Sequence, residues 1–217
     1  AFEARTGHRI LERYGMTETV MITSNPYEQA GRIPGTVGFP LPGVSVRIVG
    51  ADRQELPAGE VGEIEMSGPN PCAGYWRRPE ATAESFYADG FFRTGDTGFK
   101  DTAGRVTIAG RSKDLIISGG YNVYPAEIEM LLAEVAGVQD VAVFGVPHPD
   151  FGEAVMAAIT TEGTAFDMAA MKSVISERLA KFKQPKEVFV LDAFPRNAMG
   201  KILKNELRDR YRDSFVR

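Results

Sequence analysis

The sequence predicts an α+β fold in two parts, and three observations lead to this expectation. Gly and Pro residues concentrate in residues 31–120, where short β-type runs alternate with turns. After Gly120, runs with the apolar spacing of helices alternate with strand-like runs. Hydrophobic residues make up 43% of the 217 and charged residues 25%, as in ordinary globular proteins. We therefore expect a small barrel-like β part, residues 1–112, followed by a compact α+β part, residues 113–217.

The first part is expected to consist of short strands separated by glycine and proline turns. The segments with β-type composition are Arg9–Arg13, Val44–Val49, Val61–Ser67, Phe91–Thr94 and Arg105–Ala109. Strands this short between such turns are typical of a small barrel or sandwich-like sheet. Trp76 is expected to pack in the core of this part rather than against a ligand.

The second part is expected to contain three helices and three strands. A helix is predicted over Pro125–Val135, because Pro is favoured in the first turn and Gly137 follows the end. A second helix runs to Leu179 after Asp167, a favoured N-cap residue. The remaining predicted elements are the strands Val138–Val146, Glu153–Thr161 and Glu187–Leu191 and the basic helix Ile202–Tyr211.

Composition excludes several classes of protein. No apolar run reaches the roughly 18–20 residues of a membrane-spanning helix, and the first residues lack the pattern of a secretory signal. The net charge of −4 argues against non-specific nucleic-acid binding. The single cysteine, Cys72, cannot form an internal disulfide, and the sequence contains no Cys/His cluster with the spacing of a zinc site. A reducing, cytoplasmic compartment is therefore expected.

Charge is distributed unevenly along the second part. Residues 114–171 carry nine acidic and no basic side chains, whereas residues 172–217 carry twelve basic and six acidic ones. Two interpretations stay open. The basic residues form an ordinary solvated helical face, or they form a surface for a polyanion such as the phosphates of a nucleotide.

The segment Tyr14–Thr19, with the sequence YGMTET, has residue types suited to a nucleotide. A tyrosine ring can stack on a base, a threonine hydroxyl can donate to a phosphate, and the carboxylate of Glu18 can bind Mg²⁺ through oxygen. The alternative is a strand that ends in a simple turn.

Three further segments contain glycine turns, and two of them also contain a charged side chain. Asp96, in the turn Thr94–Asp96, is suited to accept hydrogen bonds from ribose hydroxyls. Arg111, in Gly110–Asp114, is permanently charged and can bind hydroxyls or phosphate through two donors. The glycine pair in Ser118–Asn122 allows a ligand to approach the backbone. Each of these also fits an ordinary loop.

The last such segment is Pro195–Lys201, with the sequence PRNAMGK, in which a lone lysine follows a glycine. Its ammonium group is suited to reach a phosphate or a carboxylate. The spacing of a phosphate-binding P-loop is absent from the whole chain.

Taken together and in this order, these segments resemble the motifs of the adenylate-forming superfamily, which contains acyl-CoA synthetases, adenylation domains of peptide synthetases and beetle luciferases. Tyr14–Thr19 resembles its Tyr-Gly-x-Thr-Glu motif, and Gly62–Phe86 its Gly-Glu…Gly-Tyr…Arg-Pro…Thr…Phe stretch. The later motifs match Thr94–Asp96, Gly110–Asp114 and Pro195–Lys201.

The resemblance implies a domain organisation. The phosphate loop of the family lies upstream of the segment that matches Tyr14–Thr19, and it has no counterpart here. The chain is therefore expected to be the C-terminal portion of a longer protein, and the missing N-terminal portion would be its partner. Residues 1–112 would end the large N-terminal domain with its barrel-like part. Residues 113–217 would form the mobile C-terminal domain.

The resemblance also implies a reaction and roles for the first motifs. A carboxylate attacks the α-phosphate of ATP to give an acyl-adenylate and pyrophosphate, and the thiol of coenzyme A then displaces AMP to give a thioester. ATP and AMP would be bound by Tyr14, stacked on adenine, by Asp96 and Arg111 at the ribose, and by the loop residues Gly15, Met16 and Thr17. Thr17 would contact the α-phosphate, and Glu18 would bind Mg²⁺.

Other roles follow from the later motifs. By resemblance, Lys201 is the catalytic lysine of adenylation, and Lys113 is the hinge about which the C-terminal domain rotates between the half-reactions. Ser118, Gly119 and Gly120 would line the thiol tunnel, with Lys181 and Lys183 at the phosphates of coenzyme A. The alternative for these two lysines is a solvated helix end. Relatives with this lysine motif are controlled by acylation, so a lysine acetyltransferase and deacetylase acting on Lys201 are expected partners.

The segment from Arg13 to Tyr27 most resembles malonyl-CoA synthetases. Malonate keeps a second carboxylate, which Arg13 would neutralise, and Met21 would form a wall of the acyl pocket. A structural salt bridge is the alternative for Arg13. Alternatives for the whole protein are a short- or medium-chain acyl-CoA synthetase, an adenylation domain that loads a carrier protein, oxidative chemistry of the luciferase kind, or a non-catalytic binding fragment.

Overall fold

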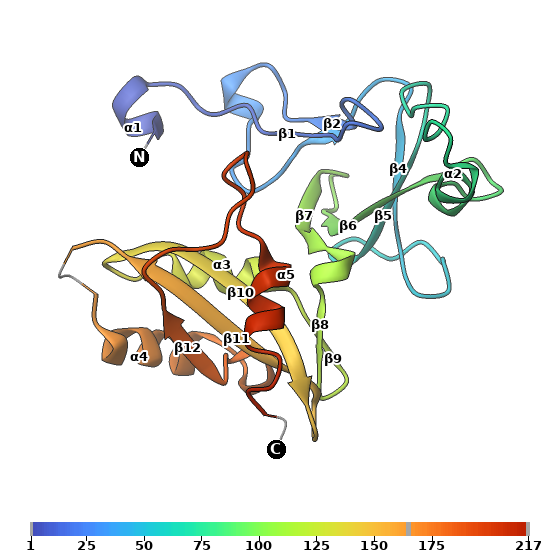
Figure 1. Ribbon diagram of the computed structural model, residues 1–217. Helices are drawn as coiled ribbons and strands as arrows, with labels where there is room; N and C mark the ends of the chain where they lie inside the picture. Colours follow the sequence, from blue (N-terminus) through green and yellow to red (C-terminus); the bar gives the residue numbers. More distant parts are fainter. Residues whose placement is uncertain (1, 164–165, 216–217) are drawn as a thin grey trace. The chain divides into compact units, whose positions relative to one another are not determined.

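The computed structural model of the chain describes residues 2–163 and 166–215 (Figure 1). The chain divides between Ser112 and Lys113 into two compact units, here called unit 1 and unit 2. Both units combine helices with β-sheets, so the predicted α+β class is confirmed. None of the helices in the described residues has the length and apolar character needed to cross a bilayer.

Unit 1 is built on two antiparallel sheets with the strand orders β1-β2-β3 and β4-β5-β6-β7. A bridge between Gly38 and Val106 joins them. The helical segments are α1 (Phe2–Thr6), η1 (Gln29–Gly31), α2 (Pro79–Ser85) and η2 (Ser112–Asp114), the last of which crosses into unit 2. The strands are β1 (Arg13–Tyr14), β2 (Thr23–Ser24), β3 (Phe39–Pro40), β4 (Ser45–Val49), β5 (Gly62–Ser67), β6 (Phe92–Lys100) and β7 (Val106–Arg111).

The structure corrects three expectations for unit 1. In the described residues its sheets stay open, because strands as short as β1, β2 and β3 cannot supply the ladder that barrel closure requires. Of the predicted strand Arg9–Arg13, only Arg13 is in a strand. Trp76 is 85% exposed, since it lies in a turn beside Arg77, whose φ is +55°, while β-strand side chains fill the core.

Unit 2 contains a five-stranded sheet in which β10-β11-β8-β9 are antiparallel neighbours and β12 lies parallel to β11. The three predicted helices and three strands are all present, whereas the hairpin β8–β9 was not predicted. The strands are β8 (Ile116–Ser118), β9 (Tyr121–Val123), β10 (Val138–His148), β11 (Gly152–Thr161) and β12 (Glu187–Val190). The helical segments are α3 (Pro125–Leu132), α4 (Met168–Arg178), η3 (Lys181–Lys183) and α5 (Lys204–Arg210).

Helices cover both faces of this sheet. Val143 and its neighbours on one face pack against Ile128 of α3 and Met171 of α4. Phe144, next along β10, points to the other face and packs with Leu207 of α5. Because both faces are buried, β10 and β11 have nearly continuous apolar runs in the sequence.

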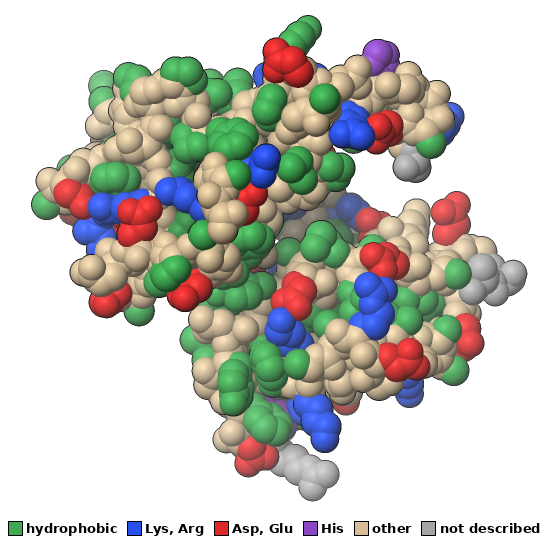
Figure 2. Space-filling model, turned by 180° about the vertical axis from the view of Figure 1, so that it is seen from behind, with side chains coloured by type: hydrophobic (Ala, Val, Ile, Leu, Met, Phe, Trp, Pro, Cys, Tyr) green, Lys and Arg blue, Asp and Glu red, His purple; other side chains and the backbone are tan. Residues whose placement is uncertain are grey.

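The uneven charge of unit 2 is explained in part by ion pairs within the unit. In the described residues, every ion pair of unit 2 joins a basic residue of the segment 172–217 to an acidic residue of the segment 114–171. The pairs are Arg178–Glu134, Lys183–Glu127, Arg196–Asp140, Lys204–Glu129 and Arg208–Asp114. On the face shown in Figure 2, basic and acidic side chains lie among one another. This arrangement favours the interpretation of a paired, solvated surface.

Candidate active site

Three residues from separate predicted motifs meet in unit 1 around the carboxylate of Asp96. The Tyr14 hydroxyl donates to Asp96 Oδ2 at 2.6 Å, and Arg111 Nε lies 3.2 Å from Asp96 Oδ1. The register of β6 and β7 places Asp96 directly opposite Arg111. Asp96 is only 6% exposed, and its backbone N–H donates to the hydroxyl of Thr94. Residues 82 positions apart in the sequence thus belong to one partly buried polar cluster.

The electrostatics of this cluster fix which group carries the proton. Burial raises the pKa of Tyr14 well above its usual range, and the hydrogen bond to Asp96 raises that pKa further. The phenol therefore stays a donor at neutral pH. The carboxylate of Asp96 keeps lone pairs beyond these two contacts, so it can also accept from the hydroxyls of a ligand beside the half-exposed Arg111.

A tight turn between β1 and β2 displays Thr17 and Glu18. It is closed by hydrogen bonds from the Ile22 N–H to the Tyr14 carbonyl at 2.8 Å and from the Thr19 N–H to the Met16 carbonyl at 3.1 Å. A Cβ atom at Gly15 would lie 1.9 Å from the carbonyl oxygen of Val20, so only glycine fits there. Val20 itself has φ +56°, which is strained for a β-branched residue.

The Glu18 carboxylate is held by a second motif. The Tyr75 hydroxyl donates to Glu18 Oε1 at 3.0 Å, and the Cys72 N–H donates to the Glu18 carbonyl at 2.7 Å. No group of three His, Cys, Asp or Glu side chains in the described residues forms a self-sufficient metal site. A single carboxylate fits Mg²⁺, because Mg²⁺ is commonly bound by one or two carboxylates together with substrate phosphates.

The predicted acyl-pocket residues Arg13 and Met21 lie on either side of the same turn. Arg13 is exposed on β1 and makes no ion pair within the described residues, which argues against the salt-bridge alternative. The amide nitrogen of Asn70 donates to the carbonyls of Thr19 and Met21 at 2.8 and 2.9 Å. Sequence reasoning missed Asn70, for which the adjoining prolines were the only signal.

In unit 2, Lys201 ends the turn that precedes α5 and is exposed. Within the described residues its ammonium group has no hydrogen-bond or ion-pair partner, whereas its backbone N–H donates to Asn197 Oδ1 at 2.9 Å. Lys113 is exposed at the boundary between the units. The next residue, Asp114, is held by Arg208 of α5 at 2.8 Å.

The glycine pair of unit 2 forms a two-residue hairpin turn between β8 and β9. Gly119 and Gly120 have φ of +60° and +80°, the left-handed conformation that such a turn requires at both positions. A Cβ at Gly120 would meet nothing within 4 Å. Ser118 is 4% exposed. The turn alone therefore accounts for both glycines, and their role in a thiol tunnel stays a prediction.

The two lysines predicted at the coenzyme A phosphates differ in their surroundings. Lys181 is exposed, whereas Lys183 Nζ contacts both carboxylate oxygens of Glu127 at 2.7 and 2.8 Å. The charge of Lys183 is therefore neutralised by Glu127. Of these two lysines, only Lys181 is free to bind a phosphate, as the prediction requires.

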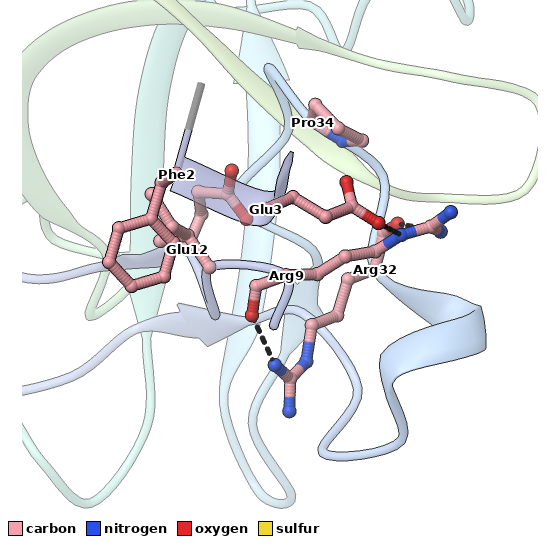
Figure 3. A pocket seen from close by; sticks show the side chains of 7 residues that line it. Phe2, Glu3, Arg9, Glu12, Arg32 and Pro34 are labelled. Carbon is pink, nitrogen blue, oxygen red and sulfur yellow. Dashed lines mark hydrogen bonds and ion pairs between the residues drawn. The ribbon is translucent and has the colours of Figure 1, made fainter. Parts of the chain in front are cut away.

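A separate pocket of about 170 Å³ lies at the start of unit 1 (Figure 3). Arg9 crosses it to reach Glu3 at 2.9 Å, and Arg32 donates to the Arg9 carbonyl at 2.6 Å. Arg9 and Glu3 thus form an ion pair within the pocket, and Arg32 is bound to a backbone carbonyl. None of the predicted site residues lines it; its labelled residues are Phe2, Glu3, Arg9, Glu12, Arg32 and Pro34.

Comparison with known proteins identifies both units. Residues 1–76 match the family model of the AMP-binding enzymes, and residues 127–201 match that of the AMP-binding enzyme C-terminal domain. The chain is 44% identical to a malonate–CoA ligase of Arabidopsis thaliana and 42% identical to an indoleacetate–CoA ligase of Aromatoleum aromaticum. These alignments cover 95% and 94% of this chain but 35% and 40% of the relatives.

Among solved structures, the chain is similar to ATP-bound MatB from Rhodopseudomonas palustris. The TM-score is 0.92 at 52% identity, over 99% of this chain and 43% of that one. The chain thus spans well under half the length of the proteins it matches, and these relatives act on carboxylic acids of different kinds.

Proposed function

Because this chain belongs to the AMP-binding, adenylate-forming enzyme family, we propose that it is the C-terminal portion of an AMP-forming carboxylate–CoA ligase. The complete enzyme would join a small carboxylic acid to the AMP part of ATP with release of pyrophosphate, and would then transfer the acyl group to coenzyme A with release of AMP. The observation that carries this proposal is the cluster of Tyr14 and Arg111 around the buried Asp96, beside the turn that displays Thr17 and Glu18.

We infer a specific role in adenylation for each of these residues. Asp96, held by Tyr14 and Arg111, would accept hydrogen bonds from the ribose hydroxyls, and Tyr14 would stack on the adenine. Thr17 would donate to the α-phosphate as the carboxylate attacks. The Lys201 ammonium would neutralise charge on the attacking oxygen and the phosphate. Mg²⁺ bound to ATP would supply further charge neutralisation, with Glu18 as its protein ligand.

Thioester formation would need a second arrangement of the same enzyme. Rotation about Lys113 would withdraw Lys201 and bring Ser118, Gly119 and Gly120 to the thiol. Lys181 would bind a phosphate of coenzyme A. Lys183 would contribute only if its pair with Glu127 opened.

The proposed acid is malonate. Its second carboxylate needs a cationic partner, and the exposed side chain of Arg13 has no ion-pair partner within the described residues. In the full-length protein, Arg13→Ala should abolish activity with malonate while activity with neutral short acids persists. Equal losses for both kinds of acid would exclude charge selection by Arg13.

The test of the function is ATP–pyrophosphate exchange by the full-length protein with a panel of carboxylic acids. Exchange that depends on one class of acid, followed by thioester formation with coenzyme A, would support the proposal. Transfer to a carrier protein in preference to coenzyme A would identify a loading domain instead. The 217-residue chain alone should show essentially no exchange, because no segment in it resembles the phosphate loop.

The exposed ammonium of Lys201 also fits the proposed control by acylation, since acylation would remove its charge. Mass spectrometry of the protein treated with a lysine acetyltransferase would test this. An unmodified Lys201 under conditions that acetylate other exposed lysines would contradict it.

A further inference from the structure

Asn197 makes four hydrogen bonds within the turn that carries Lys201. Asn197 Oδ1 accepts from the N–H groups of Met199 at 3.0 Å and Lys201 at 2.9 Å. The Asn197 N–H donates to the Lys201 carbonyl at 3.0 Å, and the Gly200 N–H donates to the Asn197 carbonyl at 2.9 Å. Both backbone polar groups of Lys201 are therefore satisfied, and the local shape of the turn is defined.

A different residue, Arg196, ties this turn to the sheet of unit 2. One of its terminal nitrogens donates to the Gly200 carbonyl at 2.7 Å, and the other contacts Asp140 Oδ2 at 2.6 Å. Asp140 lies on β10, whereas Gly200 immediately precedes Lys201. A planar guanidinium with donors in a fixed fork can make both contacts at once, which an ammonium group cannot do with the same geometry.

The base of the turn is anchored in the core, but its tip is not. Phe194 is 7% exposed and packs in the cluster around Phe144, and Ile202 packs against the same cluster. At the tip, Met199 is 91% exposed. Figure 1 shows the segment before α5 as a narrow loop projecting from unit 2. In the described residues, Arg196 is the side chain whose hydrogen bonds join the tip to a strand of the sheet.

We propose that Arg196 is a positioning residue that holds the tip of this turn in place and so presents the Lys201 ammonium outward. The inference rests on the proposed function, in which Lys201 acts in adenylation. Lys201 has a long flexible side chain, so fixing its backbone removes much of the freedom that would otherwise oppose its placement at a phosphate.

The first test uses the 217-residue chain and measures backbone order in the turn by ¹⁵N relaxation. In the wild type, the amides of Met199 and Lys201 should have order parameters near about 0.85, typical of rigid backbone. Arg196→Met should lower them below about 0.6, the range of flexible segments. Arg178→Met is the matched control, because it removes another surface ion pair of unit 2, to Glu134 at 2.7 Å, away from the turn.

The second test uses the full-length protein and separates the two half-reactions. Arg196→Met should slow pyrophosphate exchange about tenfold, the lower end expected for losing a hydrogen bond to a charged group. Thioester formation from supplied acyl-adenylate should stay at the wild-type rate, since Lys201 is withdrawn in that step. Asp140→Asn should produce a smaller loss, and Arg178→Met should affect neither half-reaction.

Three outcomes would overturn the inference. The first is unchanged order parameters at Met199 and Lys201 in Arg196→Met, whatever the activity. The second is wild-type adenylation by Arg196→Met in a protein whose Lys201→Ala variant has lost it. The third is an equal slowing of both half-reactions with a lowered Tm, which would indicate a merely structural role. If Lys201→Ala adenylates normally, the proposed role of Lys201 fails, and the order parameters still decide whether Arg196 holds the turn.

Discussion

Replacing Tyr14 by phenylalanine tests the polar cluster of unit 1 directly. The change removes only the hydroxyl that donates to Asp96 Oδ2 at 2.6 Å and leaves the ring in place. The Asp96 side chain is 8% exposed, so water has little access to replace the lost donor. Arg111 remains 3.2 Å from the other carboxylate oxygen, but its side chain is 44% exposed and partly screened by solvent.

The expected loss of stability in Tyr14→Phe follows from the burial of the Asp96 carboxylate. Leaving a buried charged acceptor without a donor costs about 1–3 kcal/mol. If the cost falls on the native state, the opening free energy of β6 and β7 drops by that amount. Amide hydrogens in these strands should then exchange about 5- to 150-fold faster.

The assay is hydrogen exchange of the 217-residue chain, resolved to peptides that cover β6 (Phe92–Lys100) and β7 (Val106–Arg111). Tyr27→Phe is the matched control, because Tyr27 is 81% exposed in the same unit. A change of less than about twofold in Tyr14→Phe, or an equal change in Tyr27→Phe, would refute the reasoning that Asp96 depends on the Tyr14 hydroxyl.

Three further predictions concern the rest of unit 1. Gly15→Ala places a Cβ 1.9 Å from a backbone oxygen of the same turn, and the resulting shift of the backbone should lower pyrophosphate exchange by the full-length protein roughly a hundredfold. Gly50→Ala is the control and should leave exchange nearly unchanged, because its Cβ would lie 3.3 Å from the end of a flexible side chain. Glu65 is fully buried. Burial raises its pKa, but hydrogen bonds from two arginines outweigh this effect and hold the pKa below the usual 4.5. Its contribution to stability should therefore be complete above that pH and be lost as pH falls through the lower folded value, and acid unfolding of wild type against Glu65→Gln would check this. Tyr75→Phe removes the hydroxyl that holds one oxygen of Glu18, so the Mg²⁺ concentration for half-maximal exchange should rise about threefold or more at an unchanged maximal rate. A fall in the maximal rate alone would contradict the role of Tyr75 in positioning Glu18.

Local elements of unit 2 were predictable because their causes lie within a few residues. Asp167 caps α4 by accepting from the Ala169 N–H at 2.8 Å, as its position before an apolar-periodic run predicted. The apolar runs of β10 and β11 identified strands that are buried on both faces. The basic terminal helix was correct within two residues at its start.

Elements that depend on distant partners escaped prediction. β1, β2 and β3 have two residues each and exist only because they pair with one another. Trp76 was expected in the core rather than against a ligand, yet the turn that holds it leaves its side chain in solvent. The hydrogen bond from Tyr75 to Glu18 joins motifs 57 positions apart, and the local sequence of neither motif predicts it.

The sequence by itself determined which chemical groups are available, the family to which they belong, and most helices and strands longer than a few residues. Only the tertiary structure decided how those groups pair. It joined the Tyr14 phenol to Asp96, and it paired basic residues of the segment 172–217 with acidic residues of the segment 114–171. The ammonium of Lys201 has no partner within the described residues. The physical reason is that backbone preference acts over a few neighbouring residues, whereas the pairing of charges depends on strand register and packing between residues far apart in the chain.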